Sequence, residues 1–158
     1  MIKKVVSGAQ TGADRAALDV AMEMGFTYGG WVPRGRLAED GTIPQHYEHL
    51  KETPEEETGL RTEWNIRDSD ATLIISHGPL DGGSLYTRVQ AEAMGRPWLH
   101  LDLDETGEEG AVRKASEWLA SVRPHTLNVA GPRASRDPYI YEKTRRILGK
   151  LLRITRPL

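Results

Sequence analysis

The sequence predicts an α/β fold, a three-layer, Rossmann-like, doubly wound sheet of about five mainly parallel strands. Short apolar runs alternate along the chain with segments of helical periodicity. Each run is apolar at nearly every position, as in a parallel strand that is buried on both faces. Several runs also end in glycine-rich sequence that leads directly into a helix. Because strands that alternate with helices need crossover connections, the strands are expected to form a parallel sheet with helices on both faces.

The apolar runs are predicted to be strands because their cores, such as Leu73-Ile74-Ile75, are short and rich in β-branched residues or leucine. In chain order these strands are Ile2–Ser7, Phe26–Val32, Ala71–Ser76, Trp98–Asp102 and Thr126–Ala130.

The intervening segments are predicted to be helices because their apolar residues recur on one face. Gly25 and Gly95 follow two of them as stop signals, and Asp137-Pro138 precedes the last as a cap and first-turn proline. In chain order these helices are Ala13–Met24, Gly59–Asp68, Ser84–Met94, Ala111–Val122 and Tyr139–Leu152.

One long segment, Pro33–Pro54, is polar and contains several prolines. We expect an ordered functional loop with little regular structure, or a lid. Trp31 could stack on a flat heterocycle there, and Arg34 or Arg36 could neutralise a phosphate.

Composition excludes several classes of protein. The 158 residues suit one ligand-binding domain over the whole chain. The absence of cysteine excludes disulfide scaffolds, zinc ribbons, iron–sulfur sites and thiol nucleophiles. A net charge of −2 argues against a nucleic-acid partner, and no apolar run is long enough for a membrane span. His46 and His49 lack a third ligand, so no metal site is expected. With no signal sequence, the expected compartment is the cytoplasm.

Three glycine-rich loops, which follow the first, third and fifth predicted strands, are candidate anion sites, because each follows a strand and opens a helix or a further loop. Backbone N–H groups at such junctions attract anions, and glycine lets a phosphate approach the backbone. The carboxyl ends of parallel strands share one edge of the sheet, so the three loops should meet there. The alternative is that the loops are tight turns only. The expected ligand-binding residues are Gly8, Gln10, Thr11, Gly12, Asp14, Arg15, Arg34, Gly82, Gly83, Ser84, Gly131 and Arg133.

Several standard motifs are absent. The chain has no G-x-G-x-x-G, no P-loop lysine with its serine or threonine, and no G-x-S-x-G elbow. Ordinary NAD binding, P-loop phosphoryl transfer and serine hydrolase chemistry therefore lose support.

The sequence also resembles a known family. Ser7–Asp19 (SGAQTGADRAALD), Gly30–Gly41 (GWVPRGRLAEDG) and Arg61–Thr72 (RTEWNIRDSDAT) are similar to the putative molybdenum-carrier family, as are Asp81–Thr87 and Asn128–Arg133. This family is a branch of the Rossmann-like nucleotide-sensing superfamily that includes the LOG phosphoribohydrolases. The resemblance implies a cytoplasmic homo-oligomer, a dimer or tetramer, that binds molybdenum cofactor (molybdopterin) or a nucleotide phosphate.

The hydrolase relatives carry a Pro-Gly-Gly-x-Gly-Thr-x-x-Glu motif, from which this sequence departs. Asp81 replaces the proline, Leu85-Tyr86 replace Gly-Thr, and Val89 stands at the glutamate position. Loss of that acid/base residue favours a carrier or storage protein over an enzyme.

Two alternatives stay open. One is a nucleotide N-glycoside (phosphoribo)hydrolase in which Asp14, Glu39 or Asp40 replaces the missing glutamate. The other is a nucleotide-sensing regulatory module.

Overall fold

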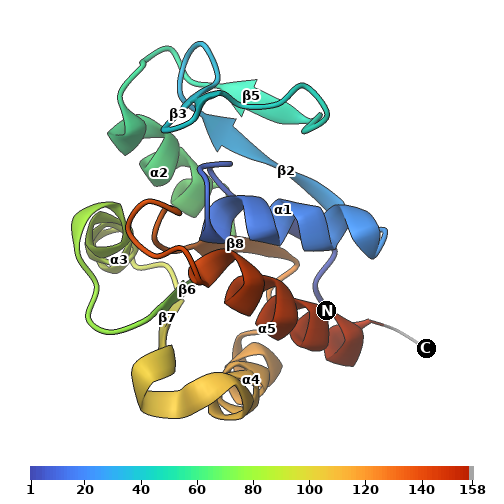
Figure 1. Cartoon of the computed structure of the whole chain (residues 1–158). Helices are drawn as coiled ribbons and strands as arrows, with labels where there is room; N and C mark the ends of the chain where they lie inside the picture. Colours follow the sequence, from blue (N-terminus) through green and yellow to red (C-terminus); the bar gives the residue numbers. More distant parts are fainter. Residues whose placement is uncertain (157–158) are drawn as a thin grey trace.

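The computed structural model describes residues 1–156, which form a six-stranded parallel sheet flanked by five helices and a small β-hairpin (Figure 1). The sheet strands are β1 (Lys4–Val6), β2 (Thr27–Val32), β5 (Leu50–Glu52), β6 (Ala71–Ser76), β7 (Trp98–Asp102) and β8 (Thr126–Ala130). The hairpin strands are β3 (Leu37–Ala38) and β4 (Gly41–Thr42). The helices are α1 (Ala13–Glu23), α2 (Thr58–Arg67), α3 (Gly82–Ala93), α4 (Leu103–Val122) and α5 (Ile140–Thr155). The predicted α/β, Rossmann-like class is confirmed.

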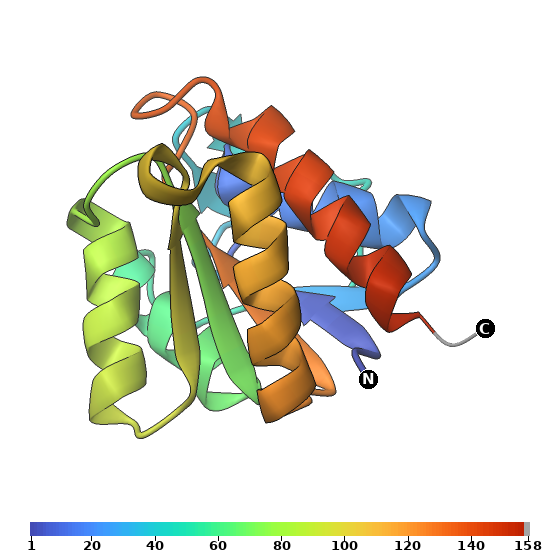
Figure 2. The ribbon, with the colours of Figure 1, turned by 90° about the horizontal axis from the view of Figure 1, so that it is seen from below.

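The strand order is β5-β2-β1-β8-β6-β7, and every pairing is parallel. Helices α1, α4 and α5 pack together on one face, while α2 and α3 cover the other. Figure 2 shows α3 on one side of β6 and β7 and α4 with α5 on the other side. The last strand in sequence order, β8, therefore lies between the first, β1, and β6, at the centre of the sheet.

The central strands are buried because helices cover both faces. All six residues of β6 are buried, and Leu127 and Val129 of β8 are fully buried beside them. α5 contributes an apolar stripe that packs on α1 and the sheet, with Ile147, Leu148 and Leu151 inaccessible to solvent. This stripe shows the helical spacing that the sequence predicts.

The segment between Pro33 and Pro54 has more regular structure than the sequence predicts. It contains the hairpin β3–β4 and the edge strand β5, which extends the expected five strands to six. The prediction of little regular structure was wrong. The sequence does not reveal β5 because this strand is only three residues long and mostly exposed. Such a strand lacks the apolar run that indicates a buried strand.

α4 begins at Leu103 rather than at the predicted Ala111. Its first turn is capped by Asp102, whose side chain accepts a hydrogen bond from the Asp104 N–H, and a kink follows at Gly107 (φ +65°). The acidic first turn carries no apolar periodicity, so the sequence indicates only the later part of the helix. None of the helices within residues 1–156 is long and apolar enough to cross a bilayer.

Candidate functional site

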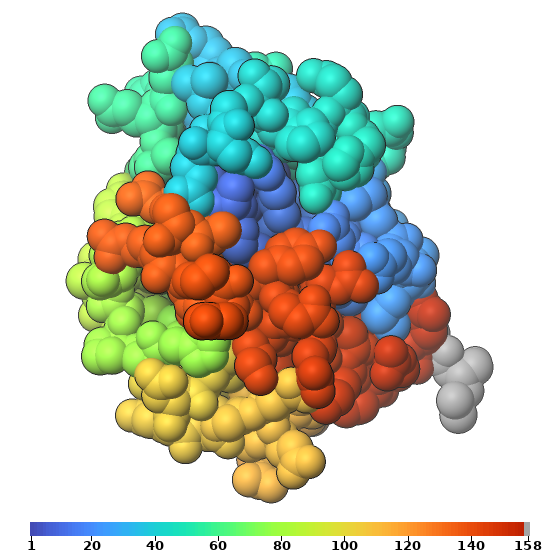
Figure 3. Space-filling view, in the orientation of Figure 1, coloured from blue at the N-terminus to red at the C-terminus, as the bar shows by residue number. Residues whose placement is uncertain are grey.

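The candidate site is a cavity of about 500 Å³ at the sheet edge where β1, β8 and β6 end. These three strands are neighbours in the sheet, so the loops that follow them meet, as predicted. α1 and α5 leave this edge toward one face and α3 toward the other, the arrangement that opens a crevice in doubly wound sheets. α2 supplies the remaining wall. In the space-filling view the loop after β8, coloured orange, lies against the green surface of α3 (Figure 3).

Predicted and unpredicted residues line this cavity together. The predicted ones are Gly8, Gln10, Asp14, Gly82, Gly83, Ser84, Gly131 and Arg133. Others that line it, which the sequence did not single out for binding, include Arg61, Asn65, Asn128 and Arg136.

The N-terminus of α3 is the part of the cavity with the best donors for an anion. The first amides of a helix, here those of Gly82, Gly83 and Ser84, have no intrahelical acceptor. The Asp81 side chain, at the N-cap, makes no capping hydrogen bond to them, and the first helical N–H to find one is that of Leu85, which donates to the Asp81 carbonyl at 3.1 Å. The dipole of the twelve-residue helix adds positive potential at the same place.

Two further features suit this helix end to a ligand. A Cβ added at Gly83 would meet no atom within 4 Å, so the backbone there is open to the cavity. Ser84 is 7% exposed, and its hydroxyl makes no hydrogen bond within the described part of the chain.

The N-terminus of α1 is less available, because the protein already uses its donors. The Ala13 N–H donates to the Pro132 carbonyl at 3.2 Å, and the Thr11 N–H to Gln10 Oε1 at 3.1 Å. Gly12 (φ +83°) lies against the loop after β8, where a Cβ would come 2.4 Å from Pro132 O. Gly12 therefore serves a close backbone contact and does not line the cavity.

The Asp14 carboxyl lies at the bottom of the cavity and is 7% exposed. Burial raises its pKa to about 6. The guanidinium groups of Arg61 and Arg15 and the N–H groups of Gln10 and Gly8 act in the opposite direction and lower the pKa. A carboxyl with this pKa can exchange a proton near neutral pH.

Arg61 of α2 is the cation at the cavity floor. Its Nη1 donates to the Gly8 carbonyl at 2.7 Å and its Nε to Thr62 Oγ1 at 3.3 Å. It has no ion-pair partner among residues 1–156, and burial lowers its pKa while Asp14 raises it. A side chain at Gly8 would clash with this guanidinium, since a Cβ there would come 2.4 Å from Arg61 Nη1. An unpaired guanidinium in a cavity is a strong partner for a phosphate or another anion.

Two buried amides line the same cavity. Asn65 is satisfied by the Trp31 backbone, with its Oδ1 2.7 Å from Trp31 N and its Nδ2 3.0 Å from Trp31 O. Asn128, 3% exposed, donates from Nδ2 to Thr72 Oγ1 at 3.2 Å, which leaves Oδ1 able to accept a hydrogen bond from a ligand.

Two arginines from the loop after β8 lie at the rim. Arg136 Nη1 is 2.6 Å from Asp81 Oδ2, and Arg133 Nε is 3.8 Å from Glu39 Oε1. Both guanidinium groups are about half exposed, so each can turn toward a bound anion.

The structure separates Thr11, Arg15 and Arg34 from the cavity, as it does Gly12. The Thr11 hydroxyl donates to Glu39 and accepts from the Ala134 N–H at 3.0 Å. Arg15 holds both carboxylate oxygens of Asp40, at 2.5 and 2.8 Å, and so fastens the Pro33–Pro54 segment to α1. Arg34 is exposed, and its ion-pair partner in the described part of the chain is Glu56.

The Pro33–Pro54 segment lines no part of the cavity, so the structure does not place it as a lid. Trp31 Nε1 donates to Asp68 at 2.8 Å and its ring packs edge-on against Trp64. Arg36 donates to the carbonyls of Ile43, Pro44 and Tyr47. Arg36 therefore holds the segment together, while Trp31 packs on α2. Glu39 and Asp40, candidates for acid/base roles, are likewise used in this attachment.

No group of three His, Cys, Asp or Glu side chains within residues 1–156 is arranged to hold a metal ion.

Comparison with known proteins decides the family. The sequence model of the circularly permutated YpsA SLOG family matches residues 5–152. The chain belongs to this family. Among solved structures, it is similar to that of a putative molybdenum carrier protein from Syntrophus aciditrophicus SB, with 51% sequence identity and a TM-score of 0.93 over 96% of this chain and 95% of that one. A search of curated proteins gives no match. The resemblance predicted from the sequence is confirmed.

Proposed function

We propose that this SLOG-family protein binds a phosphorylated heterocycle in the cavity and acts as its carrier or storage protein. The observation that carries the proposal is the free N-terminus of α3, with the Ser84 hydroxyl, in a cavity that also holds the unpaired Arg61. The phosphate would accept from the Gly83 and Ser84 amides, and Arg61 together with one of the rim arginines, Arg133 or Arg136, would balance its charge.

We take molybdopterin, as molybdenum cofactor, to be the first ligand to test, because the similar protein from Syntrophus aciditrophicus is named as a putative molybdenum carrier. The Asn128 amide oxygen would accept from an N–H of the heterocycle. A nucleotide is the other ligand of the same chemical class. The proposal places the protein in the cytoplasm as a homo-oligomer.

The direct test is titration calorimetry with molybdenum cofactor and with nucleoside monophosphates, using a variant that fills the phosphate position. Gly83→Val puts a branched side chain where no protein atom lies within 4 Å, so the fold should persist while the phosphate is excluded. Glu92→Val is the matched control, because it places valine at an exposed position of the same helix. Binding should be lost in Gly83→Val and kept in Glu92→Val. Equal affinity in both variants would refute a phosphate at this helix end.

Arg61→Met tests the charge at the cavity floor. Loss of a hydrogen bond to a charged group costs about 1.5–3 kcal/mol, so affinity for a phosphorylated ligand should fall about ten- to hundredfold. Arg113→Met, at an exposed position of α4, is the control and should bind like the parent protein. Unchanged affinity in a folded Arg61→Met protein would place the anion elsewhere.

The second candidate function is a nucleotide N-glycoside hydrolase, which one observation favours. Asp14 lies in the cavity with a pKa of about 6, suitable for a general acid or base. Hydrolysis would release ribose 5-phosphate from a nucleoside monophosphate, and Asp14→Asn would abolish that release while leaving binding intact. The carrier proposal expects no release from either protein.

A further inference from the structure

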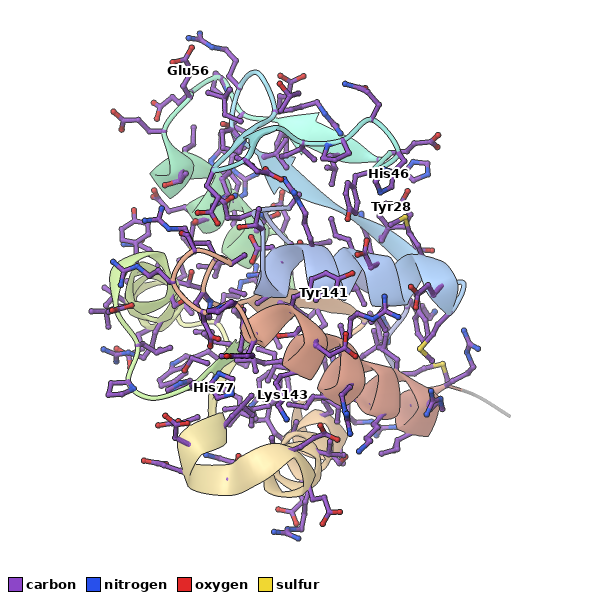
Figure 4. All side chains as sticks on the ribbon, in the orientation of Figure 1. Tyr28, His46, Glu56, His77, Tyr141 and Lys143 are labelled. Atoms are coloured by element: carbon purple, nitrogen blue, oxygen red, sulfur yellow. The ribbon has the colours of Figure 1, made fainter. Side chains whose placement is uncertain are left out.

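A second cavity, of about 690 Å³, adjoins the first. It lies between the end of β6, the start of α3 and the start of α5, and its walls combine flat apolar groups with charged ones. The apolar walls are Pro79, Leu80, Pro132, Pro138 and the ring of Tyr139. The polar side chains include His77, Asp137 and Lys143. Figure 4 shows His77 and Lys143 on the same side of the molecule, beside the start of α5.

The two cavities meet at the N-terminus of α3. Asp81, Ser84, Pro132 and Arg136 line both of them. The Ser84 hydroxyl, buried and without a partner in residues 1–156, therefore lies at the boundary, and so does the Arg136 guanidinium. An anion bound at this helix end would have open space on both sides.

Cations are distributed along the same path. Arg61 lies in the first cavity, Arg136 at the boundary and Lys143 in the second cavity, where its amine makes no ion pair within the described residues. One phosphate at a helix end needs only one or two of these groups. Cations that line both adjoining cavities match two linked phosphates, which carry more charge over a longer distance.

The polar groups of the second cavity are held in a fixed orientation. His77 Nδ1 lies 2.6 Å from Asp137 Oδ2, and Asp137 Oδ1 accepts from the Tyr139 N–H at 3.0 Å. The carboxylate orients the imidazole and leaves Nε2 for another partner. A polar group such as a sugar hydroxyl can use Nε2, and the exposed Tyr139 ring, with the prolines, offers flat surface for a heterocycle.

We infer that the site takes a two-part ligand, in which a pyrophosphate at the N-terminus of α3 joins one moiety in the first cavity to a nucleoside-like moiety in the second. This inference rests on the proposed phosphate site and extends it to a class of ligand, the dinucleotide type. Arg136 lies between the two phosphates, and its present partner Asp81 competes with them.

The test is a titration with two matched series of probes: AMP, ADP and diadenosine pyrophosphate, and GMP, GDP and diguanosine pyrophosphate. At least one dinucleoside pyrophosphate should bind tenfold or more tightly than its monophosphate. Lys143→Ala and Tyr139→Ala should remove that gain and leave monophosphate affinity unchanged. Lys114→Ala, an exposed lysine of α4, is the control for lost charge.

The ion pair at the boundary gives an independent readout. Asp81→Asn should tighten the dinucleoside pyrophosphate severalfold, because Arg136 then has no competing carboxylate. Arg136→Ala should weaken the same probe at least tenfold. Circular dichroism checks that each variant is folded.

The outcomes separate this inference from the proposed function. Failure of every dinucleoside pyrophosphate to bind overturns the two-part ligand, and failure of molybdenum cofactor and of every monophosphate as well overturns the proposed function too. If a monophosphate binds and its affinity depends on Gly83 and Arg61, but its dinucleoside pyrophosphate binds no more tightly, only the two-part ligand is overturned. The inference is also overturned if the dinucleoside pyrophosphate keeps its higher affinity in Lys143→Ala and Tyr139→Ala, since its second nucleoside would then lie elsewhere.

Discussion

At the scale of single residues, the cavity holds two ionisable groups, Asp14 and Arg61, that form no ion pair within residues 1–156. Asp14 and Arg61 influence each other's pKa, yet no ion pair joins them. Burial raises the pKa of Asp14 to about 6, which means that ionising this carboxyl costs the folded protein free energy. A binding site often accepts such a cost, because the groups that bind a ligand cannot be satisfied by the protein itself.

This cost predicts the pH dependence of stability. The folded-state pKa of Asp14 lies above its unfolded value of 3.8, so the native state binds the proton more tightly. The associated stability is present below about pH 4 and is lost as the pH rises through about 6. Two pKa units correspond to about 3 kcal/mol. Asp14→Asn should therefore be more stable than the parent protein at pH 7.5, by about 1–3 kcal/mol, and similar to it at pH 4.

Urea unfolding of both proteins between pH 4 and pH 8 checks this expectation. The difference between the two curves isolates Asp14, because Glu39 and Asp40, whose pKa values are lowered by hydrogen bonds, titrate in both proteins. A constant difference across the range would show that Asp14 is ionised in the fold at pH 4 and would contradict its raised pKa.

The residues of the site were only partly predictable from sequence. Gly8 and Gly83 stand in loops whose strand–glycine–helix order indicates an anion site. Arg61 belongs to a helix that carries no such signal, and it reaches the cavity only because α2 packs beside β2 and α3. Asn128 faces the cavity from the interior of an apolar strand. The sequence shows a polar residue within this strand, but it does not indicate which face of the sheet opens on a ligand. Arg61 did lie in a stretch that resembles the family, which was the available signal.

At the scale of elements, similar sequences produce two different helix ends. α1 and α3 both follow a strand and a glycine-rich loop, but the start of α1 is closed by the loop after β8 and the start of α3 is open. The difference depends on which strand inserts beside β1, a long-range pairing that local sequence does not indicate. The same limit explains why β5 was missed, since its three residues are held mainly by pairing with β2.

The two glycines at these helix ends should respond in opposite ways to alanine. Gly12→Ala combines a positive φ with a Cβ 2.4 Å from Pro132 O, and should destabilise the protein by about 2–5 kcal/mol. Gly83→Ala meets open space at an ordinary φ, and should be neutral or stabilise by up to about 1 kcal/mol. Urea midpoints measured by circular dichroism decide it. A Gly12→Ala protein as stable as the parent would mean that the loop after β8 lies farther from α1.

At the scale of the whole molecule, the cavity and the Pro33–Pro54 segment are held in place by different sets of contacts. The cavity is formed by loops from the central strands β1, β8 and β6 together with α2 and α3. The Pro33–Pro54 segment is fastened outside it, by Arg15 to Asp40, by Thr11 and Ser135 to Glu39, and by Tyr47 to Asp19. The tyrosine hydroxyl lies 2.7 Å from its carboxylate acceptor, and burial raises the pKa of Tyr47, so this contact stays intact across neutral pH.

This separation predicts the pattern of hydrogen exchange. The central strands should exchange slowest, because helices cover both faces and every strand there has two neighbours. The Pro33–Pro54 segment should exchange faster, since it is largely exposed and joins the sheet through the three-residue edge strand β5. A bound phosphorylated ligand should slow exchange at Gly82–Ser84 and leave the segment unchanged, because the segment lines no part of the cavity. Exchange followed by mass spectrometry, with and without the nucleotide or cofactor that binds most tightly, measures all three regions at once. Ligand protection of the segment equal to that at α3 would show that it closes over the ligand after all, and the Arg15–Asp40 and Thr11–Glu39 contacts would then be the joints of a lid instead of fixed attachments.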